Sequence, residues 1–224
     1  MPRIRTAPSI VLAALLCAGP ALAQQEISKV NGSIVAQAGR PYGDLDTVNG
    51  SITIEGGAIV KDAETVNGSI RVGDDVTADS LSTVNGSIRV GERVTVRGNV
   101  ETVNGSLFVA DGGRVGGDVE TVNGAIGLVD VDVGGSVATV SGDITVGVGS
   151  HVRGGVRVDK PSSNWFPVQI NKRKPKIVIG PGAVVEGELV FKREVDLYVH
   201  QTARIGKVTG ATPVAYSSAQ SPTD

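Results

Sequence analysis

The hexapeptide TVNGSI at residues 47–52 decides the fold, because it returns along the chain with small changes. KVNGSI precedes it from residue 29, and TVNGSI itself returns from residues 65 and 83. TVNGSL, TVNGAI and TVSGDI follow from residues 102, 121 and 139, so that successive motifs start 18 or 19 residues apart. A fixed period of this length is typical of a solenoid in which every repeat makes one coil.

The Asn-Gly step has two other interpretations, a hairpin turn and an Asn-x-Ser glycosylation acceptor. A hairpin meander would need strands of about 16 residues, whereas strands are usually about 5–6 residues long. The intervals also contain glycine pairs, such as those at 56–57 and 112–113, which indicate further bends. A coil explains the period and the bends together, and the glycosylation matches then follow from the repeat itself.

Aligned repeats predict an all-β fold. The sixth position of each repeat is isoleucine or leucine and the eighth is aliphatic, with a polar or small residue in most cases between them. This alternation is typical of a strand with one buried face. A coil divides into three segments of about six residues. We therefore expect a single-stranded β-helix with 18–19-residue coils and three short parallel sheets, in one solenoid domain over residues 24–209.

The asparagines of the motif are expected to form a ladder. An amide has two donors and an acceptor, so it can bond to its copies in the coils below and above, and such ladders stabilise stacked strands. The sequence favours an inward-pointing, structural ladder over a row on the surface that would be available to a ligand. The following glycine is expected to supply a positive φ at the corner. The predicted ladder consists of Asn31, Asn49, Asn67, Asn85, Asn104 and Asn123.

Two columns of acidic residues are expected on the outside of the solenoid. They lack the Gly-Gly-x-Gly-x-Asp pattern of calcium-binding solenoids, so the sequence favours a solvated face over a metal site. The first column precedes the motif and consists of Asp46, Glu64, Glu101 and Glu120, and the second consists of Asp74, Glu92, Asp111 and Asp130.

Catalysis is not predicted. The chain has two histidines, His151 and His200, without metal-ligand spacing around them. No nucleophile motif is present, and no long loop that would build a cleft interrupts the repeats before Val158. We therefore expect no catalytic residue, no cofactor and no bound metal.

Residues 1–23 have the features of a secretory signal peptide. Arg3 and Arg5 precede an apolar run at residues 10–17, and Ala-Leu-Ala at residues 21–23 offers a cleavage site. The run is too short to span a membrane, and we expect no transmembrane segment. The net charge of −2 gives no reason to expect a nucleic-acid partner. The protein is expected to be exported to the periplasm, the cell surface or the medium, and to end in a disordered tail at residues 210–224.

One segment, residues 160–176, breaks the repeat. It carries five basic residues, no acidic residue and the only tryptophan of the chain. Aromatic rings beside basic side chains suit an acidic envelope glycan or an anionic lipid surface, and loops on rigid scaffolds commonly carry function. Alternatively, the rings fold onto the solenoid and the lysines are only solvated. The candidate partner-binding residues are Trp165, Phe166, Lys172, Arg173, Lys174 and Lys176.

The TVNGSI and TVSGDI steps over about residues 27–158 resemble the bacterial adhesin family of repeat-containing β-solenoids. The portion with IVIGPGAVVEGE from residue 177 is similar to bactofilins, the polymer-forming bacterial scaffold proteins. The resemblances imply a right-handed β-helix without enzymatic activity. They imply surface binding in the first case and end-to-end self-association into a structural polymer in the second. An enzyme acting on polysaccharide is the least favoured hypothesis.

Overall fold

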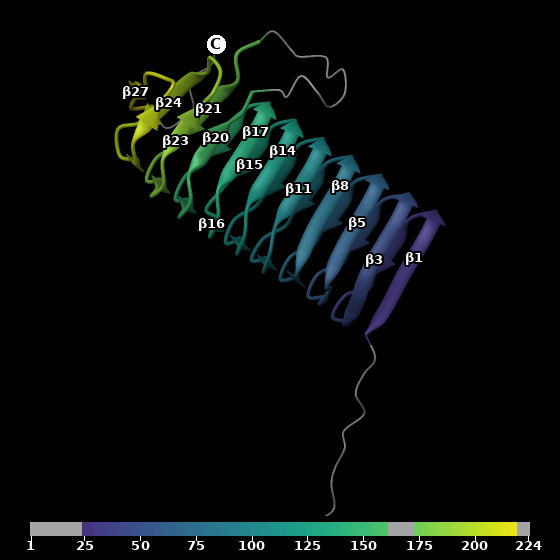
Figure 1. The fold of residues 1–224 in the computed structure, drawn as a ribbon. Coiled ribbons are helices and arrows are strands. Elements are labelled where there is room, and N and C mark those ends of the chain that lie inside the picture. The colour runs from purple at the N-terminus through teal and green to yellow at the C-terminus, as the bar shows by residue number, and fades with distance from the viewer. Residues whose placement is uncertain (1–23, 161–172, 219–224) are drawn as a thin grey trace, which may run out of the picture.

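The computed structural model describes residues 24–160 and 173–218. In these ranges the chain forms a parallel β-solenoid of strands and turns, and no helix is present (Figure 1). The predicted all-β fold, its three parallel sheets and its spacing of about 18 residues are confirmed. The predicted signal peptide and most of the insertion lie outside the described residues.

Three sheets run along the solenoid, and we name them A, B and C. Sheet A has ten strands, which are β1 (Gln25–Asn31), β3 (Tyr42–Asn49), β5 (Asp62–Asn67), β8 (Ser80–Asn85), β11 (Val100–Asn104), β14 (Val119–Asn123), β17 (Val137–Ser141), β20 (Val156–Val158), β23 (Leu189–Phe191) and β26 (Val208–Thr209).

Sheet B also has ten strands, which are β2 (Ile34–Ala36), β4 (Ile52–Ile54), β6 (Ile70–Val72), β9 (Ile88–Val90), β12 (Leu107–Val109), β15 (Ile126–Leu128), β18 (Ile144–Val146), β21 (Lys176–Ile179), β24 (Asp196–His200) and β27 (Val214–Tyr216). Sheet C is shorter and consists of β7 (Thr77–Ala78), β10 (Thr95–Val96), β13 (Arg114–Val115), β16 (Asp132–Val133), β19 (His151–Val152), β22 (Val184–Val185) and β25 (Arg204–Ile205). Isolated bridges at Pro41 and Ile59 extend it towards the N-terminus.

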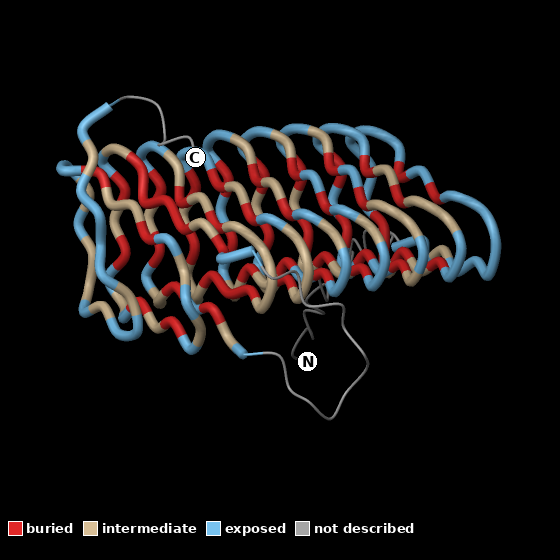
Figure 2. Tube along the Cα trace, turned by 90° about the horizontal axis from the view of Figure 1, so that it is seen from above, coloured by how far each residue is buried: buried red, intermediate tan, exposed pale blue. Residues whose placement is uncertain are grey.

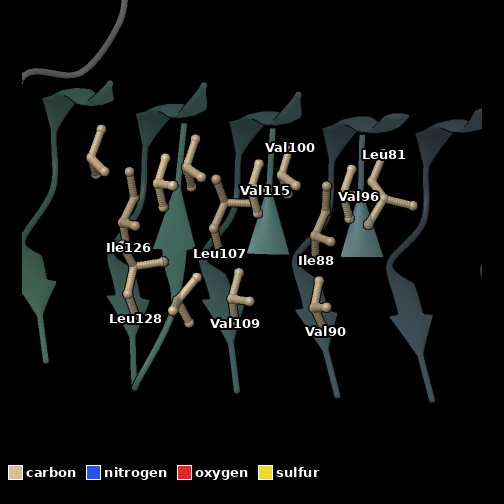
Figure 3. Close-up of a cluster of buried hydrophobic side chains, with 14 of the residues drawn as sticks. Leu81, Ile88, Val90, Val96, Val100, Leu107, Val109, Val115, Ile126 and Leu128 are labelled. Atoms are coloured by element: carbon tan, nitrogen blue, oxygen red, sulfur yellow. The ribbon is translucent and has the colours of Figure 1, made fainter. Parts of the chain in front are cut away.

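The register keeps like residues together. Asn49 pairs with Asn67 in sheet A, Ile52 with Ile70 in sheet B, and every sheet is parallel throughout. The aliphatic columns therefore stack on themselves and form one continuous core inside the three sheets (Figures 2 and 3). In the part shown in Figure 3, Leu81 enters from sheet A, Ile88 from sheet B and Val96 from sheet C, and each is at most 1 % exposed.

The glycine of the motif is needed for close approach between coils. A Cβ at Gly68 would overlap the carbonyl oxygen of Gly50 in the preceding coil, and a Cβ at Gly86 would overlap that of Gly68. Of the motif glycines, only Gly32 and Gly124 have a φ between +20° and +160°. The expectation that the corner requires a positive φ is therefore wrong for most coils, and backbone proximity is the physical reason for glycine.

The solenoid continues beyond the predicted boundary at residue 209. Strand β27 pairs with β24, so the first part of the expected disordered tail forms a strand of sheet B. The ring of Tyr216 packs edge-on against His200 at a centroid distance of 5.0 Å. Its hydroxyl donates a hydrogen bond to the carbonyl of Ile179 at 3.3 Å. The three residues VAY are too short a pattern to distinguish such a strand from a tail.

Candidate interaction surfaces

The six predicted asparagines form one continuous ladder at the corner after sheet A. The Nδ2 of Asn49 donates to Oδ1 of Asn31 at 3.1 Å, and Asn67 donates to Asn49 at 3.0 Å. The remaining links have lengths of 2.9–3.0 Å and continue to Asn123. The row lies on the surface, since most of these side chains are exposed. The expectation that it points into the core is therefore wrong.

The threonine that opens every motif except the first takes the inward position. Thr65 is buried and donates its hydroxyl to the carbonyl of Gly50 at 2.8 Å, and Thr83 does the same to Gly68 at 2.9 Å. Because side chains alternate along a strand, the next residue, valine, then points outward. This threonine column was not predicted from the sequence, although the return of threonine in every motif after the first was a signal for it.

A second row of side chains runs beside the asparagine ladder. The backbone N–H of Ser51 donates to the Oγ of Ser33, and that of Ser69 to the Oγ of Ser51, both at 3.3 Å. The same hydrogen bond recurs as far as Ala125, whose backbone N–H donates to the Oγ of Ser106. The row ends there, because alanine has no hydroxyl to accept the next hydrogen bond. The corner is thus held by side-chain bonds from coil to coil, and this favours a structural role for the motif.

The outer face of sheet A carries a valine column beside the first acidic column. Val48 is 41 % exposed and Val84 is 37 % exposed, so the column offers apolar side chains to the outside. Asp46 pairs in register with Glu64, and further along Glu101 pairs with Glu120. A groove of about 310 Å³ follows both columns over the middle coils.

The acids on this face are only partly neutralised. Burial raises the pKa of Asp46, and the negative charge of Glu64 raises it further. Burial also raises the pKa of Glu120. The positive charge of Arg157, which donates a hydrogen bond to the Glu120 carboxylate at 3.0 Å, lowers that pKa in part. The other acids that raise the pKa of Asp46 are Asp44, Glu26 and Asp62.

The second acidic column lies at the turn between sheets B and C. Asp74 accepts a hydrogen bond from the backbone N–H of Glu92, so the column is partly built into the turn. A hydrogen bond with Asp111 raises the pKa of Asp130. Over the described ranges, no group of three or more His, Cys, Asp or Glu side chains could hold a metal ion.

Three of the six candidate partner-binding residues contact the solenoid. Arg173 forms an ion pair with Asp143 at 3.1 Å, and Lys174 forms one with Glu194 at 3.1 Å. The backbone N–H of Lys176 donates to Asp143 at 2.8 Å, and its ammonium lies 5.6 Å from the ring centroid of Tyr198. Trp165, Phe166 and Lys172 lie outside the described residues. The change from TVNGSI to TVSGDI, which places Asp143 in the motif, was the sequence signal for this anchor.

The outer face of sheet B carries a short cationic strip. Arg71 pairs in register with Arg89, and Arg89 with Phe108. The guanidinium carbon of Arg89 lies 5.3 Å from the ring centroid of Phe108, a cation–π contact. Composition alone did not single out this strip, because the three residues lie in three different repeats.

The two histidines lie apart from each other. His151 on sheet C contacts Glu186 through Nε2 at 2.7 Å and faces Asp132 through Nδ1 at 3.8 Å. His200 is buried, and its Nδ1 contacts the hydroxyl of Thr202 at 2.8 Å.

These features define a repeat protein of the parallel β-solenoid class. No protein-family model, no curated protein and no solved structure matches the chain. The resemblance to bacterial adhesins and bactofilins is therefore supported in the fold and not in the family. In residues 24–160 and 173–218, no helix is long and apolar enough to cross a membrane.

Proposed function

We propose that the protein is an exported, non-enzymatic β-solenoid of the cell envelope that binds a surface partner through the insertion at residues 160–176. The observation that carries this proposal is that both ends of the insertion are fixed to the scaffold. At one end, Asp159 forms an ion pair with Lys192 at 2.7 Å. At the other, Arg173 and Lys174 pair with acids of the solenoid.

The proposal gives the anionic glycan or lipid surface a smaller electrostatic role than the sequence suggests. Arg173 and Lys174 already have acidic partners, so their charge is partly compensated within the chain. Surface ion pairs of this kind contribute little to stability, but they reduce the net positive charge offered to a ligand. The proposal therefore assigns most of the affinity to Trp165, Phe166 and Lys172.

Binding to isolated envelope fractions tests the proposal. Trp165→Ala should weaken binding at all salt concentrations, and Lys172→Ser should weaken it mainly at low salt, where charges are least screened. Lys61→Ser, an exposed lysine far from the insertion in the chain, is the matched control and should bind like the wild type. Wild-type binding by both insertion variants would overturn the assignment, and turnover of an envelope glycan would overturn the non-enzymatic role.

Export is tested separately. Residues 1–23 fused to a reporter should deliver it across the inner membrane of a bacterial host, and replacement of Arg3 and Arg5 should reduce delivery. A reporter that stays in the cytoplasm would contradict the export part of the proposal and leave the binding part standing.

A structural polymer is the second candidate, and the ends of the solenoid favour it. In the described chain, β1 pairs only with β3, and β27 pairs only with β24. Each terminal strand thus has one edge whose backbone groups can accept another strand. Filaments in electron micrographs of residues 24–224 would support end-to-end growth, and a strict monomer in sedimentation at high protein concentration would exclude it.

A further inference from the structure

A pair of acids on the outer face of sheet A and a pair of arginines on that of sheet B are complementary in charge, and they form no ion pair within the described ranges. On sheet A, the carboxylates of Asp46 and Glu64 lie one coil apart and have no ion pair with any described residue. On sheet B, Arg71 and Arg89 are also one coil apart, and neither guanidinium has a hydrogen bond or an ion pair within the described ranges. Burial and the neighbouring acids raise the pKa of Asp46, so a cation placed there would relieve a repulsion within the fold.

The two strips also match in their apolar ends. One coil beyond Glu64 the acidic column is interrupted by Ser82, beside which Val84 is 37 % exposed. One coil beyond Arg89 lies Phe108. In both strips two charges are followed, in the same direction along the solenoid, by an apolar side chain, which on sheet A lies two residues beyond the charged column.

Spacing makes the match possible between copies. Parallel strands in any sheet are about 4.8 Å apart, so two solenoids of the same sequence keep the same rise from coil to coil. Arg71 and Arg89 can then meet two successive carboxylates at once.

We propose that a second copy of this chain docks side by side and parallel, with its Arg71, Arg89 and Phe108 against Asp46, Glu64 and Val84. An antiparallel copy could form both ion pairs only with Phe108 beyond Asp46, away from Val84. Because the contact joins two different faces, each copy keeps one face free and the array is open. The contact involves neither the insertion nor the terminal strands, so it is independent of both functions proposed above.

Charge reversal on each face tests the proposal. Asp46→Arg with Glu64→Arg makes both faces basic, and Arg71→Glu with Arg89→Glu makes both acidic. Each variant alone should associate about tenfold more weakly than the wild type in sedimentation at low salt, from two lost ion pairs and new repulsion. An equimolar mixture of the two variants should associate again, since every contact in an alternating array is then between opposite charges.

Controls separate this contact from other association. Arg114→Glu with Arg153→Glu changes the net charge as much as Arg71→Glu with Arg89→Glu does, at exposed positions outside both strips, and should associate like the wild type. Phe108→Ser should weaken association without changing its salt dependence. A wild type that stays monomeric at low salt, association that persists in both charge variants, or a mixture that fails to associate would each overturn the proposal. Persistence in both variants would point to the terminal strands instead.

Discussion

The coils before the insertion and the coils after it are held together in different ways. Before the insertion, most coils form the same three hydrogen bonds to the preceding coil, from Asn to Asn, from Thr to the Gly carbonyl and from backbone N–H to Ser. After it, single contacts replace these columns, such as the guanidinium of Arg193 on the carbonyl of Val140 at 3.1 Å and the ring of Tyr216 on His200. A repeated sequence therefore stabilises coils through repetition, and an irregular one needs a specific partner for each group.

The largest difference is expected between glycines at two corners of the coil, the corner from sheet A to sheet B and the turn from sheet B to sheet C. In Gly86→Ala the new Cβ would overlap the carbonyl of Gly68, and coils would have to separate, which should cost about 2–3 kcal/mol. Gly182 lies after the insertion in open space with a φ of +67°. Gly182→Ala should cost only about 1 kcal/mol for the left-handed backbone. Urea midpoints measure both, and equal midpoints would show that coil contact does not restrict the corner.

The buried threonines should give the next largest effect. Thr83→Val removes a hydroxyl that donates to Gly68, leaves that carbonyl unpaired and should cost about 1–2 kcal/mol. Thr139, in the last motif before the insertion, is also buried, but its hydroxyl has no hydrogen-bond partner. Thr139→Val should therefore be neutral or stabilising. Thermal melts of the two variants decide the matter, and an equal loss in both would show that the hydroxyl of Thr139 is paired.

The asparagine ladder should contribute less, because it is on the surface. Asn85→Ala removes two hydrogen bonds between side-chain amides, to Asn67 and to Asn104. Water replaces part of each, so the expected cost is about 1 kcal/mol. Asn31 lies at the end of the ladder and makes one such bond. Asn31→Ala should cost about half as much. A loss above about 3 kcal/mol at position 85 in denaturant melts would require a buried ladder instead.

The repeat predicted the fold because its period and its alternation are local properties of the sequence. The same residues could not indicate which side of the corner faces solvent. Valine at the second position is as apolar as the isoleucine at the sixth, and only the inward threonine places it outside. The strip of Arg71, Arg89 and Phe108 was missed for another reason. It forms only when three repeats are stacked in register, and register comes from pairing in three dimensions.

The smallest effects are expected at the turn between sheets B and C, where Asp75 and Asp130 have positive φ values of 57° and 50°. Glycine adopts this backbone without strain, so Asp75→Gly and Asp130→Gly should gain equally from it. The pKa values of the two carboxyl groups are shifted in opposite directions. A hydrogen bond and ion pair with Arg93 lower the pKa of Asp75, whereas the hydrogen bond with Asp111 raises the pKa of Asp130.

A lowered folded-state pKa means that Asp75 stabilises the fold above its unfolded pKa and loses that contribution as the pH falls. A raised pKa means that Asp130 favours the fold only at low pH and loses that contribution as the pH rises through its folded pKa. Relative to the wild type, Asp130→Gly should therefore raise the melting temperature more at about pH 7 than at about pH 3. Asp75→Gly should show the opposite trend. Parallel pH profiles for the two variants would mean that both gain only from the relief of backbone strain, and that the charges of the neighbouring coil make no difference.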